Sequence, residues 1–208
     1  MPERFSQLLV WVLLLPPFVM ALTLHEYAHA YVAYRLGDPT AKAMGRLTIN
    51  PLKHVDWFGL ILLFVIHFGW AKPVPVNPRY FRNPRRDMVW VAIAGPFMNF
   101  FMAICAAAAI RLLTVPNEHG ILVGVLWYTM TVNIILGVFN LLPVPPLDGS
   151  RVLKGLLPEN IAYWYGGLER YSLFLLAGLF IYIQFVQPDF VGFLVRPFTQ
   201  LFSNLAGG

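Results

Sequence analysis

Charged residues are scarce in this sequence. Lys, Arg, Asp and Glu make up 12% of its 208 residues, whereas a soluble globular domain has about a quarter. Hydrophobic residues make up 58%, so the composition excludes a soluble domain and predicts an integral membrane protein. We expect an all-α fold, a polytopic helix bundle of about four to six membrane segments with a short membrane-associated β element.

Cysteine is nearly absent. The single Cys105 lies in an apolar run, so the chain cannot form an intrachain disulfide. We expect this residue to be a small buried hydrophobe.

The net charge of +5 does not indicate a nucleic-acid partner. The Lys and Arg residues lie in loops between apolar segments, where they report membrane topology rather than a basic binding face. The lipid bilayer is therefore the partner that the composition predicts.

The stretch Thr23–His29 carries the pattern His-Glu-x-x-His inside apolar sequence. On a helix, His25 and His29 lie one turn apart on the same face, so their imidazoles can bind one tetrahedral metal ion. Glu26 lies beside them, where its carboxylate can take a proton from a water on the metal. Such residues are costly in a membrane-type run unless they have a function, so the stretch predicts a metal site.

Clusters of Pro, Gly, Asn and Asp divide the chain into apolar segments, because these residues favour turns and interrupt helices. The first segment should end at Gly37-Asp38-Pro39. We predict helices at about Phe5–Arg35, Met88–Leu113, Ile121–Leu142, Ser150–Leu157 and Ser172–Val186, with Phe190–Phe202 as a last short span or an interfacial helix.

The connection between the first two long segments contains three shorter patterns. Trp57–Trp70 is apolar but has only fourteen residues, and a full span needs about twenty. We predict that it enters the membrane from the cytoplasm without crossing. Arg46–Ile49 alternates, which predicts a short strand. The alternating prolines of Lys72–Asn77 exclude a helix and allow only an extended edge strand.

Two histidines and a water leave a zinc site one protein ligand short. If Trp57–Trp70 does not cross, the second long segment leaves the side on which the first ends, and the third returns to it. Asp148 then lies on the same side as His25 and His29, and we predict that it completes a site for one zinc ion per chain. Most Lys and Arg residues lie in the loops on this side, so it should be cytoplasmic.

Three motifs occur in the order and rough spacing of the site-2 protease family: His25–His29, Gly95–Asn99 and Asn140–Gly149. Over about Leu8–Leu157 the chain resembles a compact bacterial or archaeal member of that family. The resemblance implies an intramembrane zinc metalloprotease, which hydrolyses peptide bonds within or near transmembrane segments of other membrane proteins.

The resemblance also implies roles for single residues. The metal ligands would be His25, His29 and Asp148. Glu26 would be the general base, and Asn140 matches a family position that helps to hold the substrate or the oxyanion. Lys72–Asn77 resembles the membrane-associated strands with which an unwound substrate could pair.

We expect a single transmembrane metalloprotease domain over residues 1–208. Its catalytic core should lie at about 8–157 and its C-terminal membrane helices at about 160–205. The sequence departs from better-known members by inserting Trp57–Trp70, by lacking an extra span before the motif helix, and by lacking a PDZ or CBS domain.

Other functions stay open on the residues alone. A buried His-Glu-His-Asp cluster also suits a non-proteolytic membrane protein that binds or transports metal. A transporter would distribute its polar groups along a path across the bilayer, whereas these cluster at one depth. A metal-dependent hydrolase acting on lipid is the third alternative.

Three polar residues are further candidates for substrate or transition-state support: Asn140, Asn99 and His54. For Asn99, as for Asn133, an interhelical hydrogen bond is the alternative role. For His54 the alternative is a surface loop residue capped by Asp56.

Overall fold

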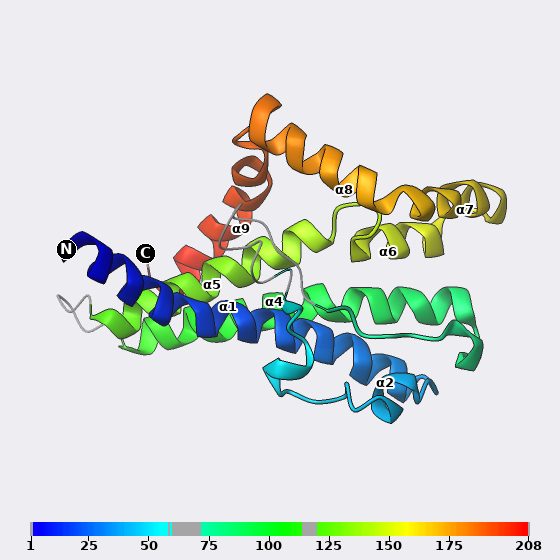
Figure 1. Ribbon diagram of the computed structural model, residues 1–208, viewed down its shortest axis with the longest axis horizontal. Helices are drawn as coiled ribbons and strands as arrows, with labels where there is room; N and C mark the ends of the chain where they lie inside the picture. The colour runs from blue at the N-terminus through cyan, green and yellow to red at the C-terminus, as the bar shows by residue number, and fades with distance from the viewer. Residues whose placement is uncertain (1, 58, 60–71, 114–119, 208) are drawn as a thin grey trace.

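The computed structural model describes residues 2–57, 59, 72–113 and 120–207, and this part of the chain contains helices but no β-strand. The all-α prediction is therefore confirmed. Four helices pack together, as Figure 1 shows: α1 (Pro2–Arg35), α4 (Pro84–Leu113), α5 (Ile121–Asn140) and α9 (Phe190–Ala206).

Helix α1 ends where the sequence predicts. Its last residue is Arg35, and Gly37 adopts a φ of 109°, a left-handed conformation that glycine takes at little steric cost. Pro16 and Pro17 lie inside α1, and the helix continues past both.

The core of the bundle lies between α4, α5 and α9. Ala103, Ala106 and Ala107 of α4 are buried there with Val195 and Phe202 of α9. Small side chains allow helices to approach closely in a membrane, so the alanines explain the tight α4–α5 contact. The predicted segment Phe190–Phe202 is thus a helix packed on the bundle.

Helices α1 and α4 run antiparallel. The side chain of Asn99 reaches the carbonyl oxygen of Ala21, whereas His29 reaches that of Val91. The C-terminal end of α1 and the N-terminal end of α4 therefore lie at the same end of the bundle.

Three helices of the described residues are long and apolar enough to cross a membrane: α4, α5 and the continuous stretch Glu159–Val186. The last comprises α7 (Glu159–Gly166), η3 (Gly167–Tyr171), α8 (Ser172–Ile181) and the π-helical η4 (Tyr182–Val186). Figure 1 shows α8 extending away from the bundle. The predicted total of four to six membrane segments stays a prediction.

The outward face of α4 is apolar. Phe97, Phe101 and Ile104 are exposed on it, and their spacing places them on one side of the helix. Cys105 is exposed on the same helix, one turn after Phe101. The expectation of a buried cysteine is therefore wrong, because in a membrane helix an apolar side chain can face outward as readily as inward.

The connection from α1 to α4 contains the short helices α2 (Thr40–Ala43), η1 (Pro51–Lys53) and η2 (Pro78–Tyr80). The strand expected at Arg46–Ile49 is not formed. The N–H of Arg46 closes a turn onto the carbonyl oxygen of Ala41, 2.8 Å away, and the following residues bend. The prediction that Trp57–Trp70 does not cross the membrane falls largely outside the described residues.

The Lys72–Asn77 segment is neither helical nor paired as a strand, but both of its ends are held. Lys72 donates its N–H to the carbonyl oxygen of His54 at 2.8 Å and accepts a hydrogen bond from Arg46 Nη2 at 2.7 Å. Asn77 donates its N–H to the buried carboxylate of Asp38 at 2.7 Å. These contacts fix the segment beside the C-terminal half of α1.

A tight turn joins α5 to α6 (Asp148–Leu156). A β-carbon at Gly149 would lie 2.1 Å from the carbonyl oxygen of Leu141, so the turn closes only because glycine stands there. Asp148 is thereby placed at the first position of α6, two residues before the predicted helix start.

Candidate metal centre

His25, His29 and Asp148 meet at one buried point. The Nε2 atoms of the two histidines are 3.0 Å apart, and each lies 3.1 Å from Asp148 Oδ2. The histidines come from successive turns of α1, and the aspartate comes from the start of α6. The structure thus brings together the three residues that the sequence predicts as ligands.

Both histidines are oriented through their other ring nitrogen. His25 Nδ1 lies 2.6 Å from Asn99 Oδ1, and His29 Nδ1 lies 2.7 Å from the carbonyl oxygen of Val91. Because these oxygens can only accept, each Nδ1 carries a proton, which leaves Nε2 as the ring atom that can present a lone pair to a metal ion. Two lone pairs directed at one point are the arrangement of histidines that hold a metal ion.

Asn99 is itself held in place. It is fully buried, and its amide nitrogen donates to the carbonyl oxygen of Ala21 at 3.3 Å and to Asn133 Oδ1 at 2.9 Å. These two bonds turn the Asn99 oxygen towards His25. Asn99 therefore holds the His25 ring in place, and Asn133 holds Asn99 from α5.

The surroundings of Asp148 favour the ionised form of its carboxyl group. Burial alone would raise its pKa, but His29 and His25 hold the pKa well below its usual range. A carboxylate oxygen beside two imidazole nitrogens is one of the donor sets found in catalytic zinc sites, in which a water takes the fourth position.

Gly95 of α4 leaves the room that the two imidazoles need. A β-carbon at this position would lie 2.4 Å from His29 Nε2 and 2.6 Å from His25 Nε2. Zinc binds nitrogen and oxygen at about 2.0–2.2 Å, and a point at that distance from all three donor atoms exists above the centre of the triangle that they form. The residues present therefore fit a zinc ion.

We predict that Gly95→Ala removes zinc. The new methyl group must displace both ligand rings, so the zinc affinity should fall by more than the roughly 10–100-fold typical of changes outside the ligand shell. Alanine favours helix, so α4 itself should persist. Zinc content of the dialysed protein measures the effect, and Gly124→Ala is the matched control, because nothing lies within 4 Å of its β-carbon. Full zinc content in Gly95→Ala would contradict the assignment.

Glu26 lies against the Lys72–Asn77 segment. Its Oε2 accepts the N–H of Val74 at 2.8 Å, and Oε1 has no hydrogen bond within the described residues. The carboxylate is thus fixed at one oxygen and available at the other. The prolines at 73 and 75 have no N–H, so Val74 supplies the only donor over these three residues.

Two candidates from the sequence do not touch the triad in the described structure. Asn140 donates its amide to the carbonyl oxygen of Leu136 in its own helix at 3.0 Å. His54 is buried, and its Nε2 donates to the carbonyl oxygen of Thr48 at 2.8 Å. His54 is therefore not a surface residue, and it braces the loop to which Lys72 is bound.

Sequence analysis missed three groups that hold the site. The carbonyl oxygen of Val91 and the N–H of Val74 belong to the main chain. Contacts of this kind cannot be predicted from the residue type. Arg46 is buried and bound to Lys72, whereas its sequence pattern predicts a strand residue and a loop charge. The flanking residues Pro73 and Pro75 could have indicated the role of Val74, because they leave its N–H as the only main-chain donor there.

A sequence model of peptidase family M50 matches residues 14–119 and 112–165 of this chain. The chain belongs to peptidase family M50. This confirms the resemblance to the site-2 protease family that the three motifs carry.

Two relatives align with this chain over about three quarters of their own length. The "Putative zinc metalloprotease YwhC" of Bacillus subtilis is 42% identical over 172 residues, which cover 78% of this chain and 77% of the relative. The "Putative zinc metalloprotease Rip2" of Mycobacterium tuberculosis H37Rv is 31% identical over 200 residues, covering 93% and 74%. No solved structure matches this chain.

The M50 assignment and the buried triad agree with each other. The chain is a zinc metalloprotease of family M50, and zinc is its cofactor. The helices that are apolar enough to span a membrane agree with a membrane enzyme.

Proposed function

We propose that this chain is an intramembrane protease, a zinc metalloendopeptidase that hydrolyses peptide bonds within or near transmembrane segments of membrane proteins. The observation that carries the proposal is the buried triad of His25, His29 and Asp148, with Glu26 beside it, inside a bundle of apolar helices. A site built at this position can be reached by a substrate that is itself in the membrane.

The residues of the site have separate tasks in this proposal. His25, His29 and Asp148 would hold zinc, which polarises the scissile carbonyl and lowers the pKa of the attacking water. Glu26 takes the proton of that water and passes it to the leaving amine. The Val74 N–H keeps the Glu26 carboxylate in position for both transfers.

A helical substrate hides its carbonyl groups in its own hydrogen bonds and must unwind before it is cut. The Lys72–Asn77 segment supports the unwound form, because its backbone lies beside Glu26 and can pair with an extended chain. The N–H of Val76 has no partner among the described residues. Asn140, the last residue of α5, would also help to hold the substrate.

Cleavage of a model transmembrane peptide by the purified protein tests this function. We expect cleavage that a zinc chelator abolishes and added zinc restores, with cuts mapped by mass spectrometry inside or beside the apolar segment. Metal flux into proteoliposomes without peptide cleavage would instead indicate a transporter. Release of fatty acids without peptide cleavage would indicate a lipid hydrolase.

We propose further that the site faces the cytoplasm. Lys53 and Arg82 are exposed in the connection between α1 and α4, whose flanking helix ends lie together. In a Cys105→Ala background, Lys53→Cys and Arg82→Cys should resist an impermeant thiol reagent in intact cells and react after lysis. Arg111→Cys, at the opposite end of α4, should react from outside. Labelling of only one of the first two from outside would show that the chain between them crosses the membrane.

A further inference from the structure

A cavity of about 590 Å³ lies beside the metal centre. Its walls come from the Lys72–Asn77 segment, the beginning of α4, α6 and α7. None of the three metal ligands lines it. We call it the α4–α6 pocket.

Three chain elements lead from the metal centre into this pocket. On α4, Val91 binds His29, and Met88, three residues earlier, lines the pocket. On α6, Asp148 is a ligand, and Arg151, three residues later on the same face, lines the pocket. Three helical residues span about 4.5 Å, so the pocket begins one turn from the metal centre on both helices.

The third element is the segment proposed to pair with substrate. Val74 donates its N–H to Glu26 and also lines the pocket, as does Val76. A substrate chain that lies along this segment with its scissile bond at Glu26 therefore continues into the pocket. This continuity identifies the occupant as the part of the substrate that flanks the cut.

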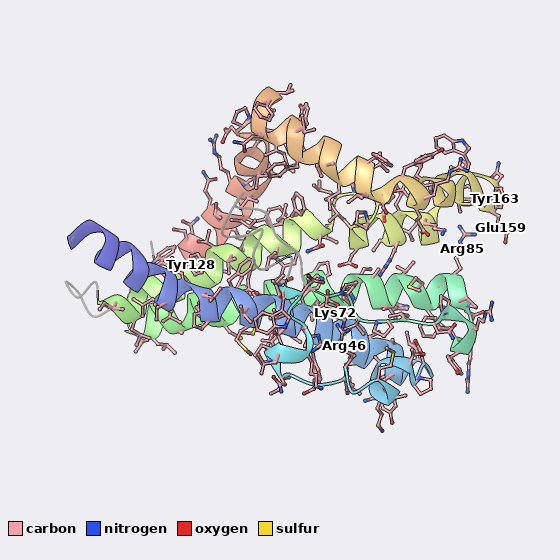
Figure 2. All side chains as sticks on the ribbon, in the orientation of Figure 1. Arg46, Lys72, Arg85, Tyr128, Glu159 and Tyr163 are labelled. Carbon is pink, nitrogen blue, oxygen red and sulfur yellow. The ribbon has the colours of Figure 1, made fainter. Side chains whose placement is uncertain are left out.

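The charges of the pocket differ between its inner and outer ends. Lys154 is neutralised by Glu169 at 2.9 Å. Arg85 donates its Nε to the carbonyl oxygen of Gly155 in α6 at 3.0 Å, and Figure 2 shows Arg85 and Glu159 at the same end of the molecule. Arg151, the basic residue closest to Asp148 along α6, has no ion pair or hydrogen bond within the described residues. The inner end therefore presents one uncompensated positive charge.

We propose that the α4–α6 pocket receives the substrate residues next to the scissile bond and that Arg151 selects an acidic side chain among them. This specificity rests on the proposed protease function. An extended chain advances about 3.3 Å per residue, and the pocket begins about 4.5 Å from the metal centre, so the selected residue should stand at least about two positions from the cut. Arg151 contributes by pairing with a carboxylate that would otherwise enter the pocket without a partner.

The test uses model transmembrane peptides that differ only at one flanking position, which carries Glu, Gln or Lys. For the unmodified enzyme, kcat/KM should fall in the order Glu, Gln, Lys at one of these positions, by up to roughly fivefold for each step, because Arg151 is exposed and an exposed ion pair contributes at most about that factor. The order should reverse in Arg151→Glu and flatten in Arg151→Gln. Lys53→Glu, an equal charge reversal at an exposed residue outside the pocket, should keep the original order.

The outcomes separate the two proposals. Cleavage of all three peptides at equal rates would overturn the pocket assignment and leave the protease function intact. A preference that follows the anionic lipid content of the vesicles, but not the peptide residue, would also overturn it. If the enzyme cuts no peptide of the series, both proposals fail. Because each preference is a ratio within one variant, a partial loss of folded protein in Arg151→Glu does not affect the comparison.

Discussion

Replacing Glu26 with glutamine is expected to leave zinc bound and to lower the rate of cleavage by about 10²–10⁴-fold, the usual contribution of a general base. Glutamine has nearly the same shape as glutamate, and its carbonyl oxygen can still accept the N–H of Val74. The variant should therefore keep the geometry of the site. It loses only the ability to take a proton from water.

Zinc analysis and peptide cleavage, measured on the same preparation of Glu26→Gln, check this result. Asp189→Asn is the matched control, since it also replaces a carboxylate by its amide, but at an exposed residue of the turn before α9. The control should keep both zinc and activity. Substantial turnover by zinc-loaded Glu26→Gln would remove Glu26 from the role of base.

Asp148→Ala is expected to lose zinc and activity together. It removes one of three donor atoms, and the two remaining imidazoles would have to hold the ion with two waters. The loss of zinc affinity should exceed the roughly 10–100-fold seen when a residue behind a ligand is changed. Competition with a zinc chelator of known affinity measures it, and His25→Ala should behave alike.

Ser150→Ala is the control for damage to the start of α6. The hydroxyl of Ser150 donates to the carbonyl oxygen of Leu147 at 2.7 Å, so this variant perturbs the same helical turn without touching the donor atoms. It should retain zinc. A stoichiometric zinc content in Asp148→Ala, in contrast, would show that another residue completes the site.

The positions of the helices could be predicted from local sequence. Gly37 follows the end of α1, and Gly120 stands directly before α5. Both boundaries could be predicted because glycine and proline affect the backbone at the residue where they stand. The proximity of Asp148 to the histidines could also be predicted. The side of the membrane on which Asp148 lies depends on how many times the chain crosses between His29 and Asp148, and the lengths of the apolar runs indicate that number.

The supporting contacts of the site could not be predicted in the same way. Asn99 and Asn133 are both amides inside apolar helices, and only the packing of α4 between α1 and α5 decides which of them reaches His25. The burial of Arg46 depends on the path of the Lys72–Asn77 segment. Such contacts join residues far apart in the sequence, so they cannot be predicted from the periodicity of a single helix.

The expected strand at Arg46–Ile49 shows the limit of an alternating pattern. Alternation indicates that two faces differ, but a strand forms only where a neighbouring backbone can accept its hydrogen bonds. Arg46 instead bonds to Ala41 and Lys72 through its main chain and side chain. The pattern therefore reports the partial burial of this loop rather than a sheet.

The contacts that fix His29 and Glu26 are made by main-chain atoms, the carbonyl oxygen of Val91 and the N–H of Val74. Alanine scanning removes side chains and leaves these atoms in place. A scan would register Asn99, but at both valines it would report only the loss of buried side-chain packing and would miss the main-chain group that steadies the zinc site. A map of this enzyme drawn from side-chain truncation would therefore understate the role of the backbone, which only proline or an amide-to-ester replacement can expose.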